Sequence, residues 1–209
     1  MLGSFKNISV GIINLGSCNL FSIYNAFKDI GYNVKILDYK KKINVDILVL
    51  PGVGSFPVAM SNIKKNEVDL RIFDHVEKNK TIFGICLGMQ LLFEGSFEFG
   101  FNKGLSLLRG NVKKIKNNSI RVPNIGWCKL QNIKKNSFIP TQLRGKYLYF
   151  VHSFYCDALE KEDIVSLTSL SKFKFCNSEQ KKKIFGTQFH PEKSGEFGIK
   201  ILKNLKTFI

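Results

Sequence analysis

In Ile82-Phe83-Gly84-Ile85-Cys86-Leu87-Gly88-Met89, a cysteine between two glycines joins an apolar strand to an apolar helix. A strand, a Gly-x-Cys-x-Gly turn and a helix form the nucleophile-elbow pattern, with Cys in place of Ser. The glycines permit a sharp turn that holds the nucleophile clear of the sheet. The positive N-terminal end of the helix favours the Cys86 thiolate, and the Leu87 N–H is placed to hold an oxyanion. A buried structural cysteine packed between glycines is the alternative interpretation.

Strands and helices alternate on the N-terminal side of this stretch. We expect strands at 9–13, 34–37, 47–50 and 82–85, and helices at 19–30, 57–64, 68–78 and 89–93, with Gly31 ending the first helix. Shorter strands are expected around Val112, Leu130, Leu148, Ile164 and Phe173, before a final helix over about 197–208. Alternation is typical of a parallel sheet covered on both faces. We therefore predict one α/β domain over 1–209, with a mixed, mostly parallel central sheet and helices on both faces.

A second motif, Gln188-Phe189-His190-Pro191-Glu192, offers a base for the cysteine. In extended backbone, residues two apart point the same way, so His190 and Glu192 are expected to lie on one face. The carboxylate would then orient the imidazole, which is the arrangement of a catalytic triad. A lone histidine is more often structural, but a His-x-Glu pair beside an elbow cysteine favours catalysis.

A third motif, Pro51-Gly52-Val53-Gly54, follows directly after a predicted strand. Glycines here allow backbone N–H groups to approach a ligand. An ordinary turn explains this segment equally well when it is taken alone.

The chain carries a net charge of +16, from 32 basic and 16 acidic side chains. The basic residues are mostly lysines in short scattered runs, such as Lys40-Lys41-Lys42 and Lys181-Lys182-Lys183, without interleaved aromatics. A nucleic-acid binder usually gathers its basic residues into a patch or stripe. We therefore expect solvated surface charge and no nucleic-acid partner, with a patch for phosphorylated substrates or an acidic partner as the alternative.

The five cysteines occur at scattered spacings and without a CxxC pair, so we expect neither a disulfide framework nor a zinc site. Reduced thiols fit a cytosolic protein better. We find no apolar run of about 18 residues and no secretory signal pattern, so we predict a cytoplasmic protein without a membrane span.

Five blocks of the sequence carry a resemblance to a known family. They are Pro51-Gly52-Val53-Gly54-Ser55-Phe56, Gly84-Ile85-Cys86-Leu87-Gly88-Met89-Gln90, Val122-Pro123-Asn124-Ile125-Gly126-Trp127, Tyr149-Phe150-Val151-His152-Ser153 and Gln188-Phe189-His190-Pro191-Glu192-Lys193-Ser194-Gly195. The whole chain resembles class I glutamine amidotransferases, and among them the glutaminase subunits of imidazole glycerol phosphate synthase. The cysteine elbow and the His-Pro-Glu motif are shared by the superfamily, whereas the other blocks point to this subunit.

The resemblance implies a reaction that agrees with the triad. Cys86 attacks the glutamine amide, His190 moves the protons with Glu192 as its partner, and water hydrolyses the glutamyl thioester. It also implies a heterodimer with a cyclase subunit, which uses the ammonia on a phosphoribosyl-aminoimidazole-carboxamide nucleotide in histidine biosynthesis. The products are imidazole glycerol phosphate and AICAR, and neither a cofactor nor a metal is implied for the glutaminase.

The resemblance also implies a substrate site. Gln90 and the backbone near His152 and Ser153 would hold glutamine, and Gly52 and Val53 would supply or gate a second oxyanion donor. For His152, a structural histidine is an equally good interpretation.

We also expect a partner surface. Pro123 and Trp127 are candidate interface anchors, with core packing as the alternative, and Lys193 is a candidate for a charge pair with the cyclase. The N-terminal loop departs from the family, which usually has Asp-Tyr-Gly-x-Gly-Asn-Leu where this chain has Asn14-Leu15-Gly16-Ser17-Cys18-Asn19-Leu20. Because this loop lies outside the triad, the departure concerns the partner and leaves the glutaminase chemistry intact.

Other functions remain open at this point. Paralogues of the subunit feed ammonia to cyclase-like partners that aminate surface sugars. A free-standing cysteine hydrolase or peptidase would work without a partner. A binding or scaffold protein is disfavoured because Cys86, His190 and Glu192 are all present.

Overall fold

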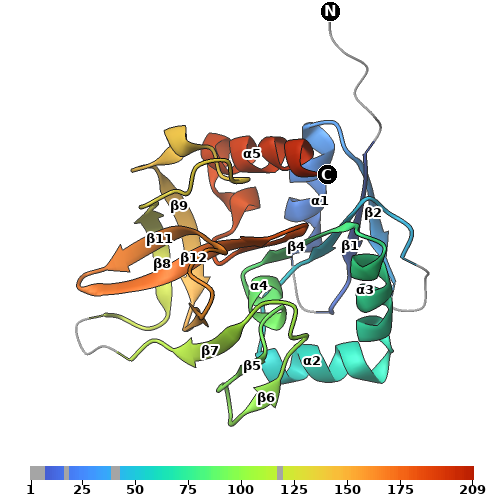
Figure 1. The fold of residues 1–209 in the computed structure, drawn as a ribbon, viewed down its shortest axis with the longest axis horizontal. Helices are drawn as coiled ribbons and strands as arrows, with labels where there is room; N and C mark the ends of the chain where they lie inside the picture. Colours follow the sequence, from blue (N-terminus) through green and yellow to red (C-terminus); the bar gives the residue numbers. More distant parts are fainter. Residues whose placement is uncertain (1–7, 17–18, 39–42, 117–119) are drawn as a thin grey trace, which may run out of the picture.

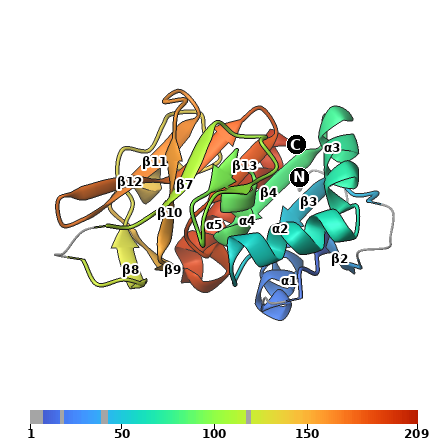
Figure 2. The ribbon, with the colours of Figure 1, turned by 90° about the horizontal axis from the view of Figure 1, so that it is seen from below.

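The computed structural model describes residues 8–16, 19–38, 43–116 and 120–209. Its centre is a large mixed sheet with helices on both faces (Figures 1 and 2), as expected from the sequence. The first half of the sheet is parallel and consists, in spatial order, of β2 (Asn33–Leu37), β1 (Ser9–Ile13), β3 (Ile47–Leu50), β4 (Thr81–Ile85) and β13 (Ile184–Thr187).

The second half of the sheet is mostly antiparallel. It begins at β13, which runs parallel to β4 but antiparallel to β12, and so joins the two halves. Its other strands are β12 (Phe173–Lys181), β11 (Ile164–Leu170), β10 (Phe154–Ala158), β7 (Gly110–Lys114), β5 (Gly95–Ser96) and β6 (Asn102–Lys103). A separate two-stranded ladder, formed by β8 (Asn124–Lys129) and β9 (Tyr147–His152), lies beside this sheet.

Two apolar cores lie on opposite faces of the sheet. Helices α1 (Leu20–Asp29) and α5 (Gly195–Asn204) cover one face, and α2 (Phe56–Lys65), α3 (Val68–Glu77) and α4 (Leu87–Leu91) cover the other. The strands divide their side chains between the two cores by alternation: in β3, Ile47 and Val49 join the first core, and Leu48 and Leu50 the second. β3 is buried on both faces and is therefore apolar at every position, which explains why it was recognisable in the sequence.

The predicted helix ends follow from local chemistry. Asn19 caps α1 by accepting a hydrogen bond from the Ser22 N–H at 3.2 Å, and Gly31 ends the helix with a φ of +89°. The last helix is shorter than predicted, because α5 stops at Asn204 and Leu205–Phe208 continue as a 3₁₀ turn. The expected strand around Leu130 ends one residue before it, at Lys129.

No helix in the described part of the chain is long and apolar enough to cross a membrane.

Candidate active site

The nucleophile elbow is present between β4 and α4. Cys86 has a φ of +53° and a ψ of −107°, a conformation that a non-glycine residue rarely adopts. The glycines around it have no room for a side chain: a Cβ on Gly88 would lie 1.9 Å from the Leu50 carbonyl oxygen, and one on Gly84 would lie 2.6 Å from the Gly88 oxygen. The tight turn therefore depends on glycine at both positions, and the helix starts at Leu87, two residues earlier than expected.

The Gly52 segment packs directly on the start of α4. A Cβ on Gly52 would meet the Leu87 Cβ at 2.3 Å and the Gly88 nitrogen at 2.4 Å. Gly52 therefore packs against the backbone at the start of α4, and Gly52, Val53 and Leu87 line the same cavity. The glycine here is thus required by packing against the elbow, and the segment is more than an ordinary turn.

His190 and Glu192 form a buried pair. The two side chains are only 4% and 3% exposed, and Nδ1 of His190 lies 2.8 Å from Oε1 of Glu192. The reason predicted for this pairing was wrong. His190 is extended, but Glu192 lies in a 3₁₀ turn, Pro191–Lys193, so the two do not belong to one strand. The turn brings the carboxylate back to the imidazole over the same two-residue separation.

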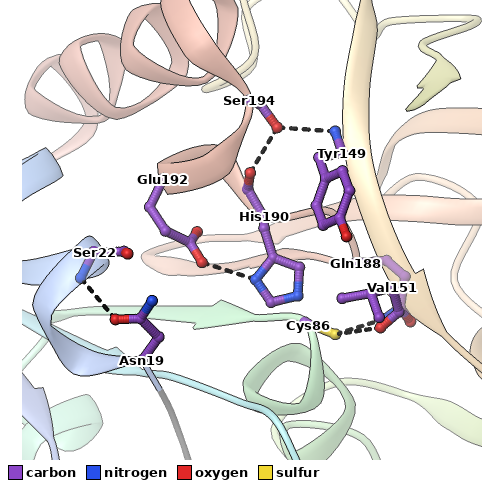
Figure 3. Close-up of polar contacts among 9 residues, drawn as sticks. All are labelled: Asn19, Ser22, Cys86, Tyr149, Val151, Gln188, His190, Glu192 and Ser194. Atoms are coloured by element: carbon purple, nitrogen blue, oxygen red, sulfur yellow. Dashed lines mark hydrogen bonds and ion pairs between the residues drawn. The ribbon is translucent and has the colours of Figure 1, made fainter. Parts of the chain in front are cut away.

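Several backbone contacts fix the position of His190. Its N–H donates to the Tyr149 carbonyl oxygen of β9 at 2.9 Å, and its carbonyl accepts from the Ser194 hydroxyl at 2.6 Å. That hydroxyl also accepts from the Tyr149 N–H at 3.0 Å. His190 is therefore held to β9 by one direct hydrogen bond and by a bridge through the Ser194 hydroxyl, whose two hydrogen bonds are drawn in Figure 3.

The electrostatics of the site favour a charged histidine. Burial by itself lowers the pKa of His190, but its interactions with Cys86 and with Glu192 outweigh burial and raise the pKa above the ordinary value of 6.5. The ring lies between the Glu192 carboxylate and Cys86 (Figure 3), and Nε2 has no hydrogen-bond partner among the described residues. The arrangement thus favours the protonated imidazole of His190 next to Cys86.

A cavity of about 270 Å³ opens at the elbow. It brings together eight residues that the sequence singled out: Gly52, Val53, Cys86, Leu87, Gln90, Pro123, His152 and Ser153. Four others complete its wall, namely Gly54, Glu98, Val151 and Phe154. Sequence reasoning missed Glu98, because it lies in the loop between β5 and β6, where no periodicity or motif marks it. Its Oε2 accepts a hydrogen bond from the Phe56 N–H at 2.8 Å.

Gln90 and His152 are held by internal hydrogen bonds. Nε2 of Gln90 donates to the Phe154 carbonyl oxygen at 3.1 Å and to Oε1 of Gln188 at 3.0 Å. His152 lies with Nδ1 2.8 Å from the Phe154 carbonyl oxygen and Nε2 2.9 Å from Nδ2 of Asn124. Burial lowers the pKa of His152 to about 4, so the ring is neutral at physiological pH. Both of its nitrogens are engaged by the protein, as expected for a structural histidine in the cavity wall, and this leaves the positioning role as a proposal.

The candidate interface residues lie at the surface. Trp127 is 54% exposed, and Pro123 and Lys193 are exposed as well. Core packing, the alternative interpretation of Trp127, is therefore wrong. Of the unusual N-terminal loop, Leu15 is buried in the second core, whereas Asn14 is exposed and accepts a hydrogen bond from the Gly16 N–H at 2.9 Å. Ser17 and Cys18 lie outside the described residues.

Comparison with known proteins identifies the family. The model of the family "Glutamine amidotransferase class-I" matches residues 11–207. The chain belongs to the class I glutamine amidotransferases. Among curated relatives of this family, it is 43% identical to the imidazole glycerol phosphate synthase subunit HisH of Caldanaerobacter subterraneus subsp. tengcongensis, over 96% of this chain and 98% of the relative. It is 36% identical to the HisH subunit of Chlorobaculum tepidum, over 95% and 100% of the two chains. The resemblance inferred from the sequence motifs is thus confirmed.

Solved structures of other amidotransferases share the fold. The structure of PurLQS from Thermotoga maritima matches with a TM-score of 0.76 at 18% identity, covering 97% of this chain and 99% of that one. A glutamine amidotransferase from Thermotoga maritima matches with a TM-score of 0.66 at 19% identity, covering 90% of this chain and 77% of that one. At such identities the likeness concerns the fold alone.

Proposed function

We propose that this chain is the glutaminase subunit of an imidazole glycerol phosphate synthase. It hydrolyses glutamine to glutamate and ammonia with Cys86, His190 and Glu192, and passes the ammonia to a cyclase subunit. The observation that carries the proposal is the Cys86 elbow beside the buried His190–Glu192 pair, in a chain 43% identical to a HisH subunit.

The reaction begins with the ion pair of the Cys86 thiolate and the His190 imidazolium. The Cys86 thiolate attacks the carboxamide carbon of glutamine, and the carbonyl π electrons move onto oxygen. The Leu87 N–H and a backbone donor from Gly52 or Val53 stabilise this oxyanion. The His190 imidazolium then gives its proton to the leaving nitrogen, the C–N bond breaks, and ammonia departs from a glutamyl thioester.

Hydrolysis restores the enzyme. Neutral His190 accepts a proton from water, whose oxygen attacks the thioester carbonyl. The C–S bond breaks, and glutamate leaves with the thiolate and the imidazolium regenerated. Glu192 acts throughout by holding Nδ1 of the imidazole and stabilising its positive charge.

The cavity wall supplies groups for the rest of the glutamine molecule. Both hydrogens of the Gln90 amide are used internally, so its oxygen is the atom left to accept from the substrate. Glu98 places a carboxylate in the same cavity and would hold the α-ammonium group. The backbone of His152 and Ser153 would complete the site, with the His152 ring as a neutral support.

The cyclase partner would dock on the surface that carries the exposed Pro123, Trp127 and Lys193. Pro123 is part of both the surface and the cavity wall, so a protein seated on it lies next to the site that releases ammonia. Trp127 would be an anchor of the heterodimer and Lys193 a charged contact next to Glu192. The four described cysteines, Cys86, Cys128, Cys156 and Cys176, are free thiols, which supports a reducing, cytoplasmic location.

A glutaminase assay tests the proposal. The purified chain is mixed with the histidine-pathway cyclase and its nucleotide ligand, and glutamate release is measured with and without the partner. We expect slow hydrolysis by the chain alone and stimulation by orders of magnitude in the complex. Fast hydrolysis without a partner would support a free-standing hydrolase instead. A response only to a cyclase-like protein from a sugar locus would replace the histidine pathway with surface-sugar amination.

A further inference from the structure

A hydrogen-bonded glutamine lies behind the nucleophile. Gln188 follows β13 directly and is fully buried, with 0% of its surface exposed. Its Nε2 lies 3.5 Å from Sγ of Cys86, and its main-chain N–H donates to the Asn177 carbonyl oxygen at 2.8 Å. Figure 3 shows Gln188 and the Val151 backbone both next to the sulfur. The triad mechanism gives this side chain no role.

The orientation of the Gln188 amide is fixed by its neighbour. Gln90 donates one amide hydrogen to the Phe154 carbonyl oxygen, at 3.1 Å, and the other to Oε1 of Gln188, at 3.0 Å. An amide oxygen accepts and an amide nitrogen donates, so Gln188 must present its NH₂ group to the sulfur. A fully buried amide with its oxygen engaged in this way has little freedom to turn over.

The sulfur therefore has two different neighbours. The Val151 carbonyl oxygen, 3.7 Å from Sγ, accepts a hydrogen bond from a thiol but repels a thiolate. The Gln188 amide, at 3.5 Å, donates to a thiolate. The first contact favours the proton on sulfur, and the second favours its transfer to His190. The balance between the two contacts influences how much of the reactive ion pair is present.

We propose that Gln188 is a positioning residue that holds the Cys86 sulfur as the thiolate, and that Gln90 keeps the Gln188 amide turned toward it. This proposal rests on the proposed function, since it concerns the nucleophile of that reaction. Gln90 then has a second role besides contacting glutamine. It lines the cavity and holds the Gln188 amide, which in turn contacts the Cys86 sulfur.

The test measures the thiolate directly, without glutamine. Cys86 lines the cavity, so iodoacetamide reaches it from solvent. The alkylation rate is followed against pH by intact mass, with Cys86→Ala as the blank for the other cysteines. Gln188→Met keeps the length of the side chain and removes its donor. We expect the midpoint of the profile to rise by about one pH unit, because a hydrogen bond to a charged group is worth roughly that much.

Two further variants keep the test decisive. Gln90→Met leaves Gln188 in place but frees its amide, so we expect a smaller shift in the same direction. Gln180 lies in β12 of the central sheet, and its Oε1 accepts a hydrogen bond from the Phe138 N–H at 3.0 Å. Among the described residues, it has no hydrogen bond to the network around the Cys86 sulfur. Gln180→Met is therefore the matched control and should leave the alkylation midpoint unchanged. If Gln188→Met does not fold, as judged by circular dichroism and binding to the cyclase, the Gln90→Met profile decides.

Kinetics separate this inference from the proposed function. In complex with the cyclase, Gln188→Met should lower kcat about tenfold at neutral pH and change KM far less. At alkaline pH, the kcat of this variant should return most of the way to the wild-type value. An unchanged alkylation midpoint in an active, folded Gln188→Met or Gln90→Met variant would overturn the role of Gln188 while leaving the glutaminase intact. Absence of glutaminase activity in the wild-type complex would instead overturn the proposed function itself.

Discussion

Replacing Glu192 with glutamine tests what the buried carboxylate contributes to the base. The carboxylate lies 2.8 Å from Nδ1 of His190, and both side chains are at most 4% exposed, so solvent screens the interaction little. A hydrogen bond to a charged group contributes about 1.5–3 kcal/mol. If the carboxylate acts on the charged imidazolium of the transition state, its loss lowers kcat by about 10- to 150-fold.

The substitution should also shift the pH dependence of kcat in a definite direction. Glu192 is one of the groups that raise the pKa of His190, so Glu192→Gln should lower that pKa. The imidazolium that protonates the leaving ammonia is then lost at a lower pH. The alkaline limb of kcat, measured in the complex with saturating glutamine, should move toward neutral pH. His190→Ala should lose more activity than Glu192→Gln, because it removes the proton carrier itself.

Glu196→Gln is the matched control for this experiment, since Glu196 lies four residues further along with a side chain that is 69% exposed. It should leave both kcat and the alkaline limb unchanged. A folded Glu192→Gln enzyme with the wild-type alkaline limb, or with a loss equal to that of His190→Ala, would refute the assignment of Glu192 as the orienting carboxylate.

Four other changes have expected outcomes. Cys86→Ala should abolish glutamine-dependent synthesis by the complex and preserve ammonia-dependent synthesis; retained glutamine hydrolysis would contradict its role as nucleophile. Lys193→Ala should weaken stimulation by the cyclase more than it raises KM for glutamine. A larger effect on KM than on stimulation would contradict the assignment of Lys193 to the interface. Burial raises the pKa of Glu179 to about 8, so the folded state binds more protons than the unfolded state between about pH 5 and 8 and loses stability as the pH rises. The free energy of unfolding of Glu179→Gln, measured in urea, should therefore increase relative to that of wild type by on the order of 3 kcal/mol as the pH rises from about 5 to 8. The exposed Glu77→Gln is the control and should show no such change. A difference between Glu179→Gln and wild type that stays constant with pH would contradict this prediction. EDTA should leave the glutaminase rate unchanged, and activity lost on chelation and restored by zinc would overturn that expectation.

The parallel half of the fold was predictable because burial on both faces leaves a strong signal. β3 is apolar at every position, and the segment that follows β1 has helical periodicity with a glycine after its last turn. The antiparallel half was less accessible. β13 has only four residues, and although it forms a hairpin with the preceding strand β12, its place beside β4 depends on contacts with a strand about 100 residues earlier in the sequence. No local pattern specifies such a neighbour.

The site was predictable to the extent that it depends on the backbone. Gly84 and Gly88 mark the elbow because their packing excludes any Cβ, and such positions are visible as glycines in the sequence. Glu98 and Gln188 escaped assignment because the roles that we propose for them arise from tertiary contacts alone. The His190–Glu192 pair was recognised for the wrong reason, since a 3₁₀ turn replaces the expected strand.

The β8–β9 ladder shows why the proposed partner surface was only partly predictable from the sequence. Exposure alternates along β8: Asn124 and Cys128 are buried, whereas Ile125 and Trp127 are 62% and 54% exposed. Ile125 and Trp127 therefore share the outward face, and two large apolar side chains on one exposed face favour a protein contact. The sequence suggested Trp127 because a large aromatic side chain often carries binding energy, but the exposure of Ile125 is recognisable only in the structure. Nδ2 of the buried Asn124, on the same strand, lies 2.9 Å from Nε2 of His152 in the cavity wall, so a partner docked on this face, as we propose, would contact the strand that supports the proposed glutamine site.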